Sequence, residues 1–174
     1  MMEAEIGNGS PGEPGFPTEI VGLGLYFEDH AVGRRFRTVG RSITETELAN
    51  FICLAGILEE LFTSLDYIEN HSIITGRLVP GALVYSIAEG LVITATLQRT
   101  GLAFLEMDLK VCRPTFAGDT IHVECEVLEA RLTSKPDRGI VKTLNKVVNQ
   151  RGETVLIYAP VRMVRTRKPG AVAE

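Results

Sequence analysis

The sequence predicts an α+β protein in which an antiparallel sheet curls around one long apolar helix. Residues 80–93 form an almost unbroken apolar run of helical length, and the spacing of apolar residues changes from helical to alternating after residue 104. The chain has 174 residues, 45% hydrophobic and 23% charged, a balance typical of one folded domain of ordinary size.

The domain itself is expected to span residues 23–167. Residues 1–22 contain the Gly- and Pro-rich stretch GNGSPGEPGFP and show no apolar period, so they are predicted to form a flexible arm. Residues 168–174 are predicted to form a short tail.

The first helix is predicted to begin at Thr44, because Thr44 and Glu47 have the spacing of a capping box. It is expected to end near Gly56. Apolar residues lie between them at helical spacing: Leu48, Phe51, Ile52 and Ala55.

The second helix is predicted to start at Pro80, which suits a first helical position because its missing N–H is not needed there. The residues through Ile93 are apolar on nearly all sides, so this helix should be covered over most of its surface. Ser86 and Glu89 are its polar side chains. A buried glutamate needs a partner, and an arginine is the first expectation.

Segments 105–112, 121–126, 141–147 and 155–164 alternate apolar and polar residues, as strands do. Turn signals separate them, and the last three are predicted to form an antiparallel meander. An earlier extended segment around residues 35–41 is assigned to the same sheet. Pro160 is expected at an edge or a bulge, because proline cannot donate to a ladder.

Composition argues against several classes of function. The formal net charge of -4 is unlike the basic excess of nucleic-acid-binding proteins. No apolar run approaches the length of a membrane span, and no secretory signal is visible, so a cytoplasmic protein is expected. The three cysteines (Cys53, Cys112, Cys125) are expected to be reduced core thiols. No metal-ligand spacing, phosphate-binding glycine loop or nucleophile motif is present.

Three segments resemble the MaoC-like dehydratases and (R)-specific enoyl-CoA hydratases. These are YFEDHAVGRRF followed by RSITE (residues 26–36 and 41–45), GRLVPGAL (76–83) and RPTFAGDT (113–120). Their order and separation make the set more specific than any one of them. The family has the hot-dog fold, whose order of helix and then meander agrees with the elements predicted above.

The resemblance implies hydro-lyase activity on an enoyl-CoA or 3-hydroxyacyl-CoA, a role in fatty acid metabolism, and a dimer that binds the acyl thioester between its subunits. It also implies that the backbone amide of Gly81 holds the thioester carbonyl, since a helix N-terminus offers free N–H groups and a favourable dipole. It implies no metal and no cofactor other than the CoA of the substrate.

The chain departs from the family at the catalytic pair. The family's aspartate and histidine, which act together on water, align with Ile57 and Phe62, and a second histidine aligns with Pro80. Neither isoleucine nor phenylalanine transfers protons, so weak or absent conventional hydratase activity is expected. Glu59 and Glu60, which lie beside these positions, are candidates for a lone general base if burial raises a pKa; otherwise they are solvated charges.

The remaining polar residues have both functional and ordinary interpretations. His71 lies near the expected site, His122 is expected on the solvent face of a strand, and His30 lies where the family has no catalytic group. Two basic groups are candidates for binding the CoA phosphates, or are ordinary surface charges: Arg34, Arg35, Arg37 and Arg41, and Arg162, Arg165, Arg167 and Lys168.

Three hypotheses follow. The chain is a hydratase with displaced catalytic residues, a non-catalytic acyl-CoA-binding or partner subunit, or a thioesterase that uses Glu59 or Glu60. Association into a homodimer or a larger homo-oligomer is expected in each case.

Overall fold

The structure, a computed structural model, describes residues 20–167. Apart from residues 20–22, the predicted arm and tail lie outside this range. The elements in chain order are η1 (Phe27–Asp29), β1 (Arg35–Arg37), β2 (Arg41–Ser42), α1 (Glu45–Ala55), α2 (Glu60–Thr63), α3 (Leu65–Asn70), α4 (Gly81–Thr96), β3 (Gly101–Val111), β4 (Thr120–Leu132), β5 (Arg138–Asn149) and β6 (Thr154–Arg165).

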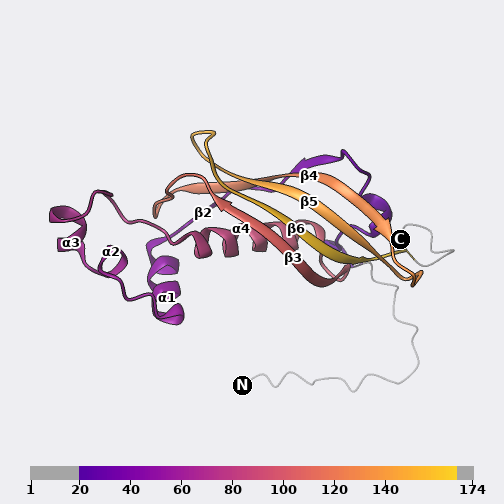
Figure 1. The fold of residues 1–174 in the computed structure, drawn as a ribbon, viewed down its shortest axis with the longest axis horizontal. Coiled ribbons are helices and arrows are strands. Elements are labelled where there is room, and N and C mark those ends of the chain that lie inside the picture. The colour runs from indigo at the N-terminus through magenta and orange to yellow at the C-terminus, as the bar shows by residue number, and fades with distance from the viewer. Residues whose placement is uncertain (1–19, 168–174) are drawn as a thin grey trace, which may run out of the picture.

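A six-stranded antiparallel sheet lies over α4, as Figure 1 shows. The strand order is β1-β4-β5-β6-β3, and β2 also pairs with β4. The predicted meander is therefore confirmed as β4, β5 and β6, and the extended segment around residues 35–41 forms β1 and β2. The sheet-on-helix arrangement predicted from the two apolar periods is confirmed as well.

The strand β3 pairs with β6, the last strand, rather than with β4, which follows it in the chain. Residues 112–119 therefore cross from one side of the sheet to the other instead of closing a hairpin. A register shift between Phe104 and Glu106 places Leu105 at a bulge, so Phe104 rather than Leu105 faces Arg162. Phe104, Met107, Leu109 and Val111 lie opposite inward-facing residues of β6, which gives β3 an apolar inner face.

The prediction that Pro160 lies at an edge or a bulge is wrong. Pro160 lies on β6, between β5 and β3, and is paired with Met107. The missing N–H of Pro160 is accommodated on the side of β6 that faces β5. There the register of β5 with β6 passes from Lys142–Val161 to Asn145–Tyr158 without a bridge at Pro160.

The helix α1 begins and ends as the sequence predicts. The Thr44 Oγ1 accepts from the Glu47 N–H at 3.2 Å, and the Glu47 carboxylate accepts from the Thr44 N–H at 2.9 Å. Gly56 closes the helix at a φ of 66°, in the left-handed region that favours glycine. Leu48 and Ile52 form its buried face.

The helix α4 extends to Thr96, three residues beyond its predicted end, with Pro80 as its N-cap. Leu83, Val84, Ile87 and Val92 pack on the sheet in a core that also contains Ile121, Val123, Val147 and Leu156. The expectation that α4 is covered on most sides is wrong for the single chain. A strip of residues along its other side is exposed: Ala82, Ser86, Gly90 and Ile93.

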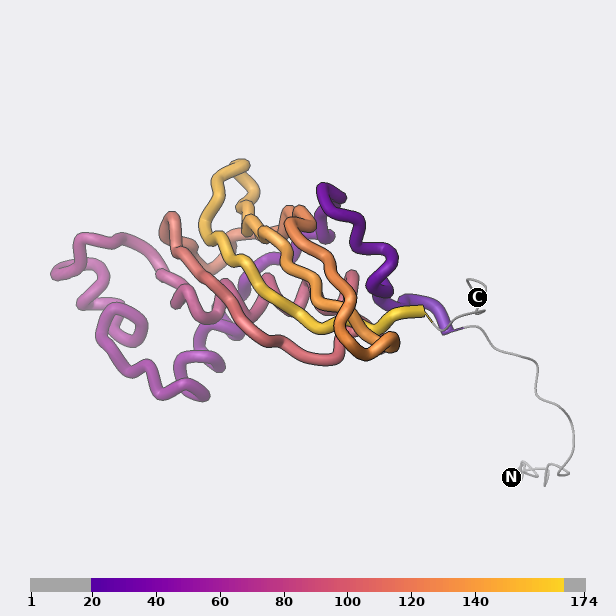
Figure 2. Tube along the Cα trace, turned by 45° about the vertical axis from the view of Figure 1, so that its right-hand side comes forward, coloured from indigo at the N-terminus to yellow at the C-terminus, as the bar shows by residue number. Residues whose placement is uncertain are grey.

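Two short helices that the sequence did not predict, α2 and α3, lie with α1 beyond one end of the sheet (Figure 1), and the turned view in Figure 2 shows the same separation. The Ser64 hydroxyl caps α3 by accepting from the Tyr67 N–H at 3.1 Å. No helix in residues 20–167 is both long and apolar enough to cross a membrane.

The cysteine prediction is only partly right. All three cysteines are free, but Cys53 and Cys112 are exposed and only Cys125 is buried. Burial raises the pKa of the Cys125 thiol to about 12, so it stays protonated in the core.

Replacing Thr44 with alanine should lower the free energy of unfolding by about 1 kcal/mol, because α1 loses its N-cap acceptor. In a domain of this size the loss corresponds to a fall in Tm of roughly 2–4 °C, measurable by calorimetry. Thr46→Ala, an exposed change within α1, is the matched control and should leave stability unchanged or slightly higher. Equal losses in both variants would show that the cap does not stabilise the helix.

Candidate functional site

A pocket of about 230 Å³ opens at the start of α4. Apart from Arg113 and Thr115 its lining is apolar, and it includes Phe62, Ile74, Leu78, Val79, Pro80, Gly81, Val84, Val111, Pro114, Val155 and Leu156. The pocket thus combines residues from α2, the start of α4, the end of β3 and the start of β6. It is suited to an extended apolar group rather than to an ion.

Gly81 places a helix N-terminus in this pocket. The Leu83 and Val84 N–H groups donate to the Pro80 carbonyl at 2.9 and 3.2 Å, which forms the first turn. Within the part of the chain that the structure describes, the Gly81 N–H donates to no acceptor. A Cβ at residue 81 would lie 2.9 Å from the Val111 side chain, so the glycine also permits close packing there. The geometry agrees both with an amide that is free to bind a carbonyl and with a glycine that is needed only for close packing at the helix start.

The segment that carries Phe62 is held over the pocket by Arg77. The Arg77 guanidinium donates to the Phe62 carbonyl at 3.1 Å and to the Glu45 carboxylate at 3.2 Å. Arg77 therefore connects α2 to the first turn of α1 and to the loop that leads into α4. In the sequence this arginine stands within the GRLVPGAL motif, and its contacts with Phe62 and Glu45 were not predicted.

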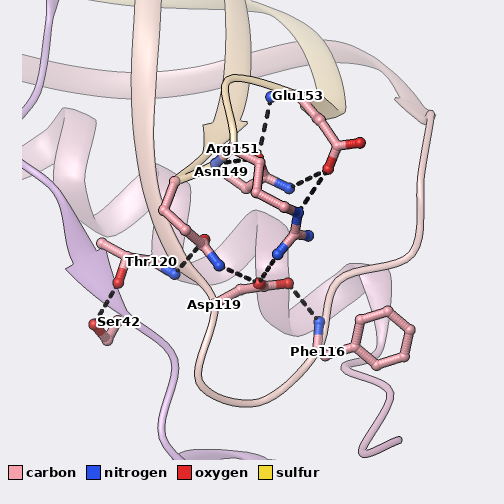
Figure 3. Close-up of polar contacts among 8 residues, drawn as sticks. Ser42, Phe116, Asp119, Thr120, Asn149, Arg151 and Glu153 are labelled. Carbon is pink, nitrogen blue, oxygen red and sulfur yellow. Dashed lines mark hydrogen bonds and ion pairs between the residues drawn. The ribbon is translucent and has the colours of Figure 1, made fainter. Parts of the chain in front are cut away.

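Residues 113–115 also line the pocket, and the loop to which they belong is fixed by the buried Asp119 (Figure 3). Its carboxylate accepts from the Phe116 N–H at 2.9 Å, the Gln150 amide at 2.6 Å and the Arg151 guanidinium at 2.9 Å. Burial alone would raise the pKa of Asp119, but these hydrogen bonds outweigh it and hold the pKa below its ordinary value.

The same loop is hydrogen-bonded to the segment that precedes α4. The Val79 N–H donates to the Thr115 carbonyl at 2.8 Å, and the Ala117 N–H donates to the Arg77 carbonyl at 2.9 Å. The RPTFAGDT motif therefore acts through backbone geometry, by holding the start of α4 in place.

The pocket itself is lined by no aspartate, glutamate or histidine among residues 20–167. Phe62, which the family resemblance aligns with a catalytic histidine, does line it, whereas Ile57 does not. Glu59 and Glu60 are exposed at the start of α2 and lie outside the lining. Neither carboxylate is buried, so the condition set for a lone general base is not met in this chain.

The histidines lie elsewhere. His71 is exposed at the end of α3 beside Tyr67, and His122 is partly exposed on β4, 3.7 Å from the Glu124 carboxylate. His30 is buried, with its Nδ1 at 2.8 Å from the Tyr26 carbonyl, and burial lowers its pKa. The described residues also contain no group of three or more His, Cys, Asp or Glu side chains that would hold a metal ion.

The predicted arginine partner of Glu89 is Arg162, whose Nη2 lies 2.7 and 2.5 Å from the two carboxylate oxygens. Most of the other predicted basic residues also have partners. Arg35 pairs with Glu126, Arg41 with Glu47, and Arg167 with Asp29. Arg34 donates to the Asp29 carbonyl at 2.5 Å, and Lys168 lies outside the described residues.

None of these basic residues within the range 20–167 lines the pocket. Arg113 does, and it is exposed, with Glu153 at 3.8 Å as its ion-pair partner. It stands within the RPTFAGDT motif, and no role was predicted for it.

Comparison with known proteins agrees with the fold. No family model matches the chain. Protein MaoC of Klebsiella aerogenes is 32% identical over 99 residues, which cover 56% of this chain and 29% of that protein. Mesaconyl-CoA hydratase of Cereibacter sphaeroides is 26% identical over 164 residues, covering 86% of this chain and 44% of that protein. The chain thus spans less than half the length of either curated relative.

A solved structure decides the family. The MaoC-like dehydratase from Rhodospirillum rubrum is 30% identical with a TM-score of 0.71, and the match covers 83% of this chain and 99% of that one. The chain belongs to the MaoC-like dehydratase family.

Two further solved structures resemble the chain. A MaoC domain protein from Chloroflexus aurantiacus is 26% identical with a TM-score of 0.80, and the match covers 90% of this chain and 45% of that one. A Mycobacterium tuberculosis protein described as a double hot-dog fold is 26% identical with a TM-score of 0.71, covering 86% of this chain and 47% of that one. The predicted hot-dog fold is confirmed.

Replacing Asp119 with asparagine should lower the free energy of unfolding by about 2 kcal/mol, because an amide has one oxygen and leaves a donor unpaired. Asp66→Asn, a change at an exposed residue of α3, is the control and should cost only a few tenths of a kcal/mol.

Because the pKa of Asp119 is lower in the folded protein, its stabilising effect is present above the unfolded value of 3.8. It is lost as the pH falls through the folded pKa. Denaturation of both proteins as a function of pH should therefore show the difference between wild type and Asp119→Asn shrinking below pH 3.8. A difference that stays constant through that range would contradict the assignment.

Proposed function

We propose that this chain is an acyl-CoA-binding protomer of the MaoC-like type that lacks conventional hydratase activity on its own. The observation that carries the proposal is the Gly81 N–H at the start of α4, which has no acceptor among residues 20–167 and lies in an apolar pocket to which those residues contribute no carboxylate or imidazole. A thioester carbonyl accepts a hydrogen bond, and a helix N-terminus favours the partial negative charge on that oxygen.

The apolar lining fits the chain that flanks such a carbonyl, since burying aliphatic groups is favourable by about 0.8 kcal/mol per CH₂. Arg113, at the rim, is the basic residue best placed to meet the charged part of CoA. Phe62 occupies the wall where the family resemblance aligns a histidine. Binding without proton transfer is what this lining supports.

The thioesterase alternative has less support. It requires Glu59 or Glu60 to act as a base within reach of the thioester, yet both side chains are exposed and outside the pocket lining.

A second copy, or a related active chain, is proposed to pack against the exposed apolar residues of β3. This strand lies at the end of the sheet, and Leu102, Phe104, Leu105, Leu109 and Val111 are 40–54% exposed along it. A long apolar edge strand exposes both side chains and unpaired backbone groups, which proteins normally cover. The M. tuberculosis relative, of which this chain spans less than half, has two hot-dog units in one polypeptide and supports such pairing.

Crotonyl-CoA should bind the wild-type protein without loss of enoyl absorbance and without release of free thiol. Gly81→Ala adds a methyl group against Val111 but keeps the N–H, so calorimetry should show affinity reduced several-fold. Gly81→Pro also removes the N–H, while proline is favoured at a first helical position, and it should bind about tenfold more weakly than Gly81→Ala.

Gly90→Ala is the matched control, because nothing lies within 4 Å of the added Cβ, and it should bind as wild type does. The Glu59→Gln/Glu60→Gln double variant should also bind unchanged. Equal affinities of the alanine and proline variants at residue 81 would remove the amide from the proposal. Rapid enoyl loss would contradict the lack of hydratase activity.

Leu109→Asp should convert a dimer into monomers, because it places a charge on the apolar inner face of β3. Light scattering coupled to size-exclusion chromatography measures the mass. Leu54→Asp, at a leucine of α1 that is 86% exposed, is the control and should remain dimeric. A monomeric wild type at micromolar concentration, or an unaffected Leu109→Asp variant, would contradict this interface.

A further inference from the structure

The inner face of the sheet carries a polar centre beneath α4, within an otherwise apolar core. Asn145 and Tyr158 lie opposite each other on β5 and β6 and are 0% and 1% exposed. Arg162 follows on β6 and is 6% exposed. Among the described residues, five buried polar atoms have no partner: Thr143 Oγ1, Asn145 Oδ1 and Nδ2, Tyr158 Oη and Arg162 Nε. Each such group costs stability, so their concentration requires an explanation.

Arg162 lies between two hollows. On one side is a closed cavity of about 10 Å³, lined by Thr143, Asn145 and Arg162 among others, which is the size of a single water. On the other side is an open groove of about 370 Å³ between α4 and β3, lined by Tyr85, Glu89, Phe104 and Arg162 among others. The ion pair of Glu89 with Arg162 therefore forms a polar part of a groove whose other walls are mainly apolar.

This groove follows the same side of α4 as the Gly81 pocket. Gly81, Tyr85 and Glu89 are four residues apart, so they lie one above another on one face of the helix. Gly81 packs against Val111 at the end of β3, and Arg162 lies 5.5 Å from the Phe104 ring near the start of β3. The rise of an α-helix separates Gly81 from Glu89 by roughly 12 Å along the axis.

We propose that the groove beside α4 takes the distal part of the acyl chain, and that the Glu89–Arg162 pair binds a hydroxyl group on that chain. This inference rests on the proposed function, in which the Gly81 amide holds the thioester carbonyl. It adds the substrate class: a hydroxylated acyl-CoA of medium length.

A hydroxyl group fits the pair because it both donates and accepts. It accepts from the Arg162 guanidinium and donates to the Glu89 carboxylate, and both side chains line the groove. A carboxylate at the same place would be repelled by Glu89. A plain alkyl chain would cover the ion pair without making the hydrogen bonds that water would otherwise make to it.

The distance separates this role from catalysis. Hydration of an enoyl thioester occurs at the carbons next to the carbonyl, whereas Glu89 lies about 12 Å further along α4. Burial and the neighbouring Glu89 carboxylate raise the pKa of Tyr85, so its hydroxyl stays protonated beside the same groove. The pair is therefore a specificity-determining feature and not a replacement for the missing acid and base.

Calorimetry with three probes tests the proposal: butyryl-CoA, decanoyl-CoA and 10-hydroxydecanoyl-CoA. Wild-type protein should bind 10-hydroxydecanoyl-CoA about tenfold more tightly than decanoyl-CoA, as expected for one net hydrogen bond to a charged group. The double variant Glu89→Leu/Arg162→Met removes both charges together, which avoids a lone buried charge. It should prefer decanoyl-CoA and bind butyryl-CoA as wild type does.

Arg35→Met/Glu126→Leu removes an ion pair on exposed side chains of β1 and β4, and as the control it should keep the hydroxyl preference. Wild-type protein that binds butyryl-CoA but shows no preference for the hydroxylated chain would overturn this inference alone, even if the double variant fails to fold. Equal affinity for butyryl-CoA and decanoyl-CoA would also overturn it, because the groove would then bind no part of the longer acyl chain. Failure to bind butyryl-CoA would overturn the proposed function as well.

Discussion

The packing of α4 against the inner face of the sheet is the constraint on which the rest of the structure depends. Its apolar residues form the main core with β4, β5 and β6, so the helix axis is fixed along the strands. Because Leu83 and Val84 bury the first turn, Gly81 is held at the edge of the core, with its N–H directed away from the helix. The same packing fixes which face of α4 is left for the groove beside β3.

Two charged residues, Arg77 and Asp119, fix the shape of the pocket although neither side chain lines it. Arg77 holds the segment that carries Phe62, and Asp119 holds the loop that accepts from the Val79 N–H. Both act on backbone groups, so the shape of the pocket is maintained although no acid or base lines it within residues 20–167. A scaffold of this kind can retain its ligand while its catalytic side chains change, because backbone amides depend on the fold and not on the side chain at that position.

Periodicity was enough to predict the helices α1 and α4 and the meander, since each depends on local spacing of apolar residues. It failed where the outcome depends on partners distant in the chain. The pairing of β3 with β6 decides that Phe104 faces inward, and a bulge between Phe104 and Glu106 shifts the alternation that the sequence shows. Pro160 was misplaced for the same reason, because a gap in the ladder of a central strand leaves no local signal in the sequence.

The candidate site could be predicted only in part, and the reason is physical. A capping box is local, so Thr44 was found from the spacing of residues, whereas Gly81 was identified through the family resemblance of its motif. Arg77, Arg113 and Asp119 stood within quoted motifs, but their partners lie in other elements. The partner of Glu89 was also predicted in part. A carboxylate in an apolar helix requires a partner, and the sequence predicts an arginine. Only the position of Arg162 on β6 identifies which arginine it is. The ion pair then links α4, which provides the anion, to the sheet, which provides the cation. Together they place a polar group in the groove at a fixed distance from the amide that begins the helix.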